Sequence, residues 1–105
     1  MSLRYEVRKS RIHGRGVFAT RVFKKGDLIG IYEGPLTKKE GAYVLYTYDD
    51  DGNEVRIAGK GTLRFVNHSS KPNADFWGDE LWAKKRINPG DEITFNYGPD
   101  WDQGK

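Results

Sequence analysis

Short apolar segments separated by glycine, proline and aspartate constrain the fold of this chain more than any other feature of its sequence. The segments are rich in Val, Ile, Phe and Tyr, and none of them supports a long helix. This spacing is typical of a mostly β domain built from many short strands. We therefore expect strands over residues 5–8, 16–21, 28–33, 44–49, 54–58, 80–85 and 92–97.

Three local signals predict how these segments are connected. Asp51-Gly52 lies between two expected strands and favours a hairpin with a type I′ turn, in which both central residues have a positive φ. Pro89-Gly90 favours a type II turn, because Pro fixes the first φ and Gly supplies the positive φ that follows. The segment 37–40 has a capping-box pattern that Gly41 stops at once, so we expect about one turn of helix there.

Length and composition limit the chain to one small domain. Its 105 residues are too few for two separate cores, so we expect a single domain over residues 1–105. Only 36% of the residues are hydrophobic, and the three Trp, six Tyr and five Phe predict a small, aromatic-rich core. The sequence has neither a membrane-spanning apolar run nor a secretory leader. This predicts an intracellular protein, cytoplasmic or, in a eukaryotic host, nuclear or chromatin-associated.

Residues that commonly bind metals are scarce. The chain has no cysteine, which excludes disulfides and zinc–thiolate sites. Its two histidines, His13 and His68, cannot hold a structural metal by themselves. A metal-dependent enzyme is therefore disfavoured, and we expect no metal site.

The charged residues are numerous but nearly balanced. Eighteen Lys and Arg and 15 Asp and Glu give a net charge of +3. The basic run at 84–86 is more typical of a solvated face than of a nucleic-acid site. Acidic patches such as 49–51 could attract a basic peptide, although solubility and turn formation account for each patch taken alone.

The segment RFVNHSSKPNADFW, residues 64–77, places a polar cluster between two apolar flanks. Its neighbouring His68 and Ser69 do not predict a hydrolase, because adjacent side chains rarely face each other and no nucleophile-elbow pattern surrounds them. Turn formation explains the two serines and Asn73. It explains Asn67 and His68 less well, because they directly follow an apolar run and so lie at a strand end, where sites are often built.

Two further motifs could carry chemistry. HGRGVFA at 13–19 lacks the third glycine and the helix of a dinucleotide site, so it predicts a turn whose backbone could approach a ligand closely. DEITFNYGPDW at 91–101 is an alternating strand in which Phe95 and Trp101, taken alone, fit a core. Tyr97 fits less easily, because its hydroxyl needs water or a partner.

Together and in this order, HGRGVFA, the YEG at 32–34, RFVNHSSKPN at 64–73 and GDEITFNYG at 90–98 resemble the SET domain of protein-lysine methyltransferases. The resemblance spans about residues 5–101. It implies several small, curved β-sheets and a C-terminal pseudoknot, an exception to unthreaded connections. It also implies methyl transfer from S-adenosylmethionine to a lysine of a basic protein or histone-like tail, with no membrane and no direct nucleic-acid contact needed.

The resemblance assigns roles to individual residues. Tyr97 would be the catalytic tyrosine, with Tyr32 lining the methyl-transfer site. Phe95 and Phe76 would be walls of the lysine channel that control the product. The cofactor would meet the backbone around His13 and Arg15, Arg64 and Asn67 at its amino-acid end, the His68 backbone at its adenine, and Trp101 over the adenine.

An aromatic channel suits this chemistry. Burial disfavours the charged form of a lysine, whose pKa is ordinarily about 10.4, and positioning can supply ~7–11 kcal/mol of the barrier. In the family, a tyrosine hydroxyl at such a wall restrains a methylated amine. Phe95 and Phe76 lack it, so the resemblance implies a di- or trimethylating enzyme.

The chain also departs from the family pattern. Ser70 stands where many members have cysteine, Asn96 where aspartate is common, and no Cys-rich tail follows that would form a zinc-bound post-SET segment. The substrate-choosing insertion before Arg64 is almost absent. So bare a core favours a homodimer that completes its peptide groove.

Two other functions account for the many Tyr and Trp residues. One is a basic β-domain whose aromatics stack on single-stranded nucleic acid. The other is a reader whose aromatic cage binds a methylated lysine. Neither explains why N-H-S at 67–69 and F-N-Y-G at 95–98 occur together in this order.

Overall fold

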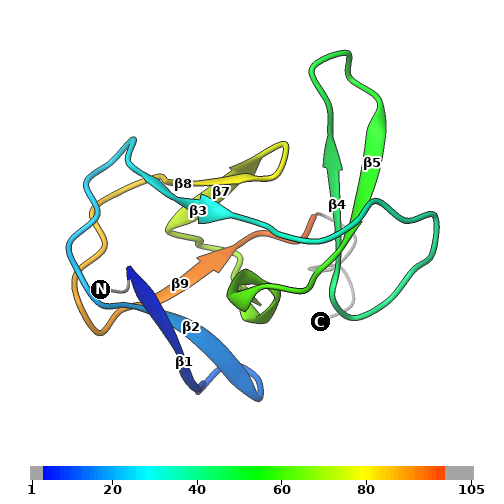
Figure 1. Cartoon of the computed structure of the whole chain (residues 1–105). Coiled ribbons are helices and arrows are strands. Elements are labelled where there is room, and N and C mark those ends of the chain that lie inside the picture. Colours follow the sequence, from blue (N-terminus) through cyan, green and yellow to red (C-terminus); the bar gives the residue numbers. More distant parts are fainter. Residues whose placement is uncertain (1–3, 99–105) are drawn as a thin grey trace.

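The structure, a computed structural model, describes residues 4–98 and is built from short strands and one 3-10 helix (Figure 1). The strands form three small sheets, with the orders β1-β2-β9-β6, β3-β8-β7 and β4-β5, so the mostly β fold is confirmed. No helix within residues 4–98 has the length and apolar character needed to cross a membrane. The elements are β1 Tyr5–Lys9, β2 Arg15–Ala19, β3 Leu28–Ile31, β4 Val44–Tyr48, β5 Glu54–Ala58, η1 Thr62–Phe65, β6 Asn67–His68, β7 Ala74–Trp77, β8 Glu80–Ala83 and β9 Glu92–Phe95.

All seven expected strands are present, most of them with slightly different ends. Sequence reasoning missed two strands. β6 is only two residues long and lies inside the polar motif, and β7 follows directly on a Pro-Asn turn signal. The parallel pairing of β6 with β9 joins distant parts of the chain and has no local sequence signal.

The predicted turns had mixed outcomes. At residues 88–91 the Asp91 N–H donates to the Asn88 carbonyl and Gly90 has a φ of 91°, as a type II turn requires. The type I′ prediction at Asp51-Gly52 is wrong, because Gly52 has a φ of 83° but no non-glycine residue within 4–98 has a positive φ. The Asp49 carboxylate accepts the backbone N–H groups of Asp51 and Asn53 and supports a longer loop.

The helical turn expected at 37–40 is also wrong. The Thr37 N–H donates to the Arg56 carbonyl, and Leu36 forms a bridge with Ile57, so this segment runs along the open edge of β5. The Thr37 hydroxyl accepts the N–H of Lys39, as in a Ser/Thr turn. Tertiary pairing and this local bond both replace the capping box.

The core lies where the three sheets and η1 meet. Val17, Ile29, Leu63, Leu81 and Ile93 are fully buried there, and burying each such side chain contributes roughly 1.5–3 kcal/mol. The fully buried part is mainly aliphatic, contrary to the aromatic-rich core expected. The partly buried aromatic side chains that pack against it are Tyr5, Phe65, Phe76 and Phe95.

Candidate active site

The site is built on the crossing of β6 and β9, which pair in parallel with Asn67 beside Thr94 and His68 beside Phe95. Figure 1 shows β9 running through the middle of the molecule, beside β2. Side chains alternate between the two faces of a strand. Asn67 therefore shares one face with Glu92 and Thr94, which we term the polar face. His68 and Phe95 lie on the other, the aromatic face.

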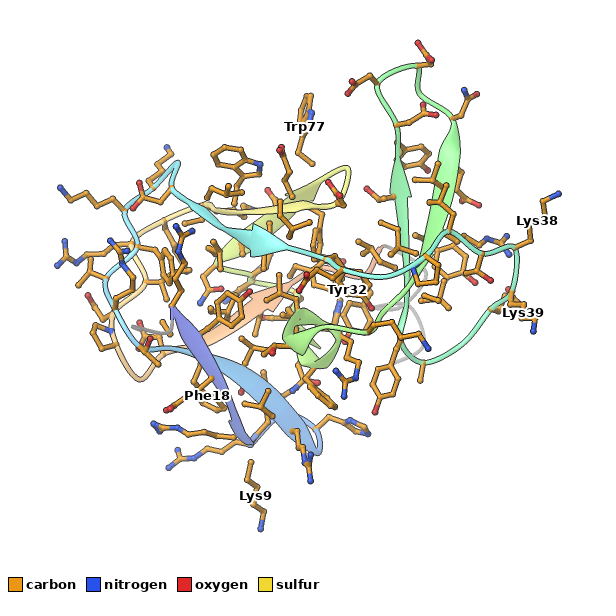
Figure 2. All side chains as sticks on the ribbon, viewed as in Figure 1. Lys9, Phe18, Tyr32, Lys38, Lys39 and Trp77 are labelled. Atoms are coloured by element: carbon orange, nitrogen blue, oxygen red, sulfur yellow. The ribbon has the colours of Figure 1, made fainter. Side chains whose placement is uncertain are left out.

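The aromatic face carries a continuous series of ring contacts, which we term the aromatic cluster. Tyr32 meets Phe76 with ring centroids 5.8 Å apart, and Phe76 meets Phe95 at 4.7 Å. Phe95 meets Tyr97 at 4.9 Å, and Tyr97 meets His68 at 5.1 Å. Figure 2 places Tyr32 at the centre of the molecule, where the chain leaves β3 toward the β4–β5 hairpin. The four residues expected to line the methyl-transfer site therefore lie together.

Both tyrosine hydroxyls of the cluster donate to backbone carbonyls. The Tyr97 hydroxyl donates to the carbonyl of Val66 at 2.8 Å, and that of Tyr32 donates to the carbonyl of Tyr43. Burial raises the pKa of Tyr32 to about 12, with Tyr97 adding to the rise and Arg64 opposing it. Burial also raises the pKa of Tyr97, and Glu92 adds to it. Both hydroxyls are therefore neutral at physiological pH and have lone pairs left to accept hydrogen bonds.

Gly59 lets the chain pass directly against the Tyr32 hydroxyl. A Cβ at this position would lie 2.5 Å from the hydroxyl oxygen and 2.8 Å from Cβ of Arg64. Any side chain there would displace the ring. The position of Tyr32 therefore depends on a residue that carries no side chain.

The polar face is organised by the buried amide of Asn67. Its Nδ2 lies 2.9 Å from the Arg15 carbonyl, 3.1 Å from the His13 carbonyl and 2.9 Å from a carboxylate oxygen of Glu92. The Ser10 hydroxyl lies 3.1 Å from the same Nδ2 and donates to Glu92. This network fixes the turn between β1 and β2 to the crossing.

Asn73 has a structural role at the same crossing. Its amide nitrogen donates to the Glu92 carbonyl at 2.8 Å, and its side-chain oxygen accepts the Thr94 N–H at 2.9 Å. The Ser69 hydroxyl accepts the N–H of Lys71. The prediction that Asn73 and Ser69 satisfy backbone groups is confirmed.

The residues expected to bind a cofactor are only partly brought together. His13 lies on the exposed turn that Asn67 fixes, and Arg15 is the exposed first residue of β2 that follows it. The His68 Nδ1 accepts the N–H of Tyr97. The Arg64 guanidinium lies 4.2 Å from the ring centroid of Phe65 and donates to the carbonyl of Gly61. Arg64 and Asn67 thus have different partners. Trp101 lies outside the described residues.

Sequence reasoning missed Ser10, Glu92 and the carbonyl of Tyr43. Glu92 left a signal, because it is an acidic residue at the start of an otherwise apolar alternating strand. Ser10 and the Tyr43 carbonyl left none, because only the tertiary structure brings them to their partners. Gly16 belongs to the same arrangement, since a Cβ there would collide with the Glu92 carboxylate.

Two shallow grooves lie outside the centre of the cluster. One, of about 550 Å³, runs along β5 and the segment 36–38. The other, of about 460 Å³, lies on the outer face of β7 and β8 and touches the cluster only through Phe76. Neither groove therefore marks the candidate site, which is defined by the ring contacts and hydroxyl groups of the aromatic cluster.

Several known proteins resemble this chain in sequence. The sequence pattern of the SET domain matches residues 14–98. Histone-lysine N-methyltransferase MEDEA of Arabidopsis thaliana is 32% identical over 92% of this chain, and TRX1 of Oryza sativa subsp. japonica is 33% identical over 85%. The chain spans only 18% and 11% of the length of these two relatives.

A crystal structure shows a similar fold. It is that of a candidate histone methyltransferase of Plasmodium falciparum, PFL0690c, with a TM-score of 0.69 and 22% identity. The match covers 96% of this chain and 98% of the other. At this identity the likeness establishes the fold alone.

Proposed function

This chain belongs to the SET-domain family, and on that premise we propose that it is an S-adenosylmethionine-dependent protein-lysine N-methyltransferase. The observation that carries the proposal is the aromatic cluster, in which two tyrosines, Tyr32 and Tyr97, are joined through the rings of two phenylalanines. The substrate we propose is a lysine in a basic protein such as a histone tail. The names of the relatives support this substrate class.

The cluster suits a neutral amine. A lysine entering between Tyr32, Phe76 and Phe95 would lose water and meet no carboxylate of the cluster, so its charged form would be disfavoured. Loss of a proton exposes the lone pair that attacks a methyl group. The aromatic face would thus both select an unbranched side chain and activate it.

The two hydroxyls would orient the amine. Each already donates its proton to a backbone carbonyl, so its remaining capacity is to accept an N–H. If the neutral amine donated its two N–H groups to these fixed acceptors, its lone pair could point in only one direction. Their raised pKa values support an orienting role, because neither tyrosinate forms near neutral pH.

The cofactor, S-adenosylmethionine, would supply an electrophilic methyl group on a sulfonium. The backbone of β6 supports an adenine contact. The Ser69 N–H donates to the Phe95 carbonyl, and β6 is the last strand of its sheet, which supports an adenine contact by the His68 backbone. We propose that Asn67 and Arg64 bind the amino-acid end of the cofactor. The backbone around His13 and Arg15 would contact it as well.

Product specificity would follow from the two phenylalanines. Phe76 and Phe95 meet nearly perpendicularly at an interplanar angle of 87°, and neither brings a hydroxyl that would restrain a methylated amine. We therefore propose di- or trimethylation. A second copy of the chain would complete the peptide groove, and in a eukaryotic host the enzyme would act at chromatin.

Methyl transfer from labelled cofactor to a panel of basic proteins, histones included, tests the proposal. Mass spectrometry should map the label to lysine side chains, and the label should be absent when the cofactor is omitted. A folded, cofactor-binding protein that labels no lysine in any substrate would refute it. Tight binding of an already methylated peptide without transfer would favour a reader instead.

A further inference from the structure

Two loops at one end of the molecule form a second feature, apart from the aromatic cluster. The loop before β3, residues 20–27, lies against the loop before β9, residues 84–91, and we term them the basic loop pair. Phe23 and Ile87 exchange two backbone hydrogen bonds of 2.9 Å, and the Gly26 N–H donates to the Ala83 carbonyl. In Figure 1 both loops lie at the end away from the β4–β5 hairpin.

The basic loop pair gathers cations from two distant parts of the sequence. The bridge between Phe23 and Ile87 is antiparallel, so Lys24 comes to lie across from Arg86. Phe23 and Ile87 are themselves buried beneath the loops, with exposures of 2% and 0%. The six exposed bases are Arg21, Lys24, Lys25, Lys84, Lys85 and Arg86.

The loop pair neutralises little of this charge. Among residues 4–98, Lys84 is the only one of the six in an ion pair, at 3.8 Å from Asp75. The acidic side chains of the two loops serve the backbone, since Asp27 accepts the Lys24 N–H and Asp91 accepts the Asn88 N–H. Like charges held opposite each other destabilise a fold. An external anion would relieve this repulsion.

The distribution of charge along the chain also favours an anion at the basic loop pair. The two loops, 20–27 and 84–91, together carry six Lys and Arg and two acids, Asp27 and Asp91. Acids collect instead at the tip of the β4–β5 hairpin, at 49–51, and at the β7–β8 turn, at 79–80. A polyanion would therefore be steered to the end with the basic loop pair.

From these observations we propose that the basic loop pair binds the phosphate backbone of double-stranded DNA. The loops expose no aromatic ring for stacking on single strands and no large apolar side chain for insertion into a membrane. Contact with phosphates alone is sequence-independent. Taken alone, the run 84–86 favours a solvated face, but the structure places a second basic loop beside it. This binding does not depend on the proposed methyl transfer.

Fluorescence anisotropy with a labelled DNA duplex, in the absence of cofactor, tests the proposal. The patch variant carries Lys24→Gln, Lys25→Gln, Lys85→Gln and Arg86→Gln. The matched control carries Lys38→Gln, Lys39→Gln, Lys60→Gln and Lys71→Gln, which removes the same charge from exposed sites elsewhere. Thermal unfolding verifies that both variants fold, and a variant with fewer of the four changes replaces either one that does not.

We expect the wild type to bind the duplex with a salt slope of about −5, since each phosphate contact contributes about −0.9. The patch variant should bind at least tenfold more weakly at low salt, with a slope smaller in magnitude by about 3–4. The control should stay within about threefold of the wild type, as uniform charge loss alone has a small effect. Equal losses in both variants, no binding to the duplex, or a preference for single strands or anionic vesicles would each overturn the proposal.

Discussion

The polar and aromatic faces of the β6–β9 crossing are built on the same two strands, yet they differ in what holds them together. On the polar face, the Asn67 side-chain nitrogen lies within hydrogen-bonding distance of four partners, on Ser10, His13, Arg15 and Glu92. On the aromatic face, rings touch at centroid distances of 4.7–5.8 Å, and the Tyr32 and Tyr97 hydroxyls donate to backbone carbonyls. This difference indicates that the polar face holds the strands and the β1–β2 turn in place. The aromatic face instead presents hydroxyl oxygens that can accept further hydrogen bonds, as the proposed reaction requires.

Tyr97→Phe should have the largest effect, and this effect should be on activity. The change removes one hydroxyl and keeps the ring contacts, so turnover should fall by roughly 10²-fold or more, the scale for a polar group that acts in a transition state. The measurement is steady-state methyl transfer to a peptide. Tyr48→Phe is the matched control, because Tyr48 is 62% exposed, and it should leave turnover unchanged. Near-wild-type turnover of Tyr97→Phe would remove its hydroxyl from the mechanism.

Tyr32 should make stability depend on alkaline pH. Its pKa in the folded state is raised from 10.0 to about 12, so the stability that it contributes is complete below pH 10 and is lost as the pH rises toward 12. The loss should approach about 2–3 kcal/mol, at about 1.4 kcal/mol per pKa unit. Urea unfolding across this range should show a shallower decline in Tyr32→Phe. An identical decline in both proteins would mean that Tyr32 does not titrate as an isolated buried group.

Asn67→Ala tests whether the polar face fixes the architecture. The change leaves the carbonyls of His13 and Arg15 and the Glu92 carboxylate without their shared donor, so the free energy of unfolding should fall by about 1–3 kcal/mol. Chemical denaturation measures this. Asn53→Ala, at an exposed turn position, is the control and should change it by less than about 0.5 kcal/mol. Equal effects would show that the network contributes no net stability.

Phe95→Tyr should have the smallest effect on stability and a selective effect on product. A hydroxyl added at the channel wall would restrain a methylated amine, so monomethyl-lysine should accumulate at unchanged thermal stability. Mass spectrometry of a peptide substrate reads the product. If Phe95 were ordinary core, the variant would unfold more easily with the same products. A native enzyme that stops at monomethylation, even at long times and saturating cofactor, would contradict the channel argument.

The two faces also differed in how far the sequence could predict them. The motifs predicted that Tyr32, Phe76, Phe95 and Tyr97 lie together, and their ring contacts agree. The partners of Asn67 could not, because Ser10 and Glu92 meet it only through long-range pairing of β2, β9 and β6.

Local signals failed where other hydrogen bonds, tertiary or local, satisfied the same backbone groups. The capping box at 37–40 lost to pairing with β5, and the Asp51-Gly52 signal lost to a loop organised by the Asp49 carboxylate. Pro89-Gly90 succeeded because its turn is satisfied within four residues. A local signal was thus predictive where no other acceptor or strand competed for the backbone groups of its turn.

Calorimetric titration of S-adenosylmethionine into the wild type, Tyr97→Phe and Asn67→Ala tests most directly whether the two faces have separate roles. Tyr97→Phe should bind the cofactor within about twofold of the wild type, because we propose that the aromatic face contacts the lysine amine and not the cofactor. Folded Asn67→Ala should bind at least tenfold more weakly, which corresponds to about 1.4 kcal/mol and is within the range for a lost polar partner. Unchanged affinity in Asn67→Ala, or an equal loss in both variants, would contradict the division of roles between the polar face and the aromatic face.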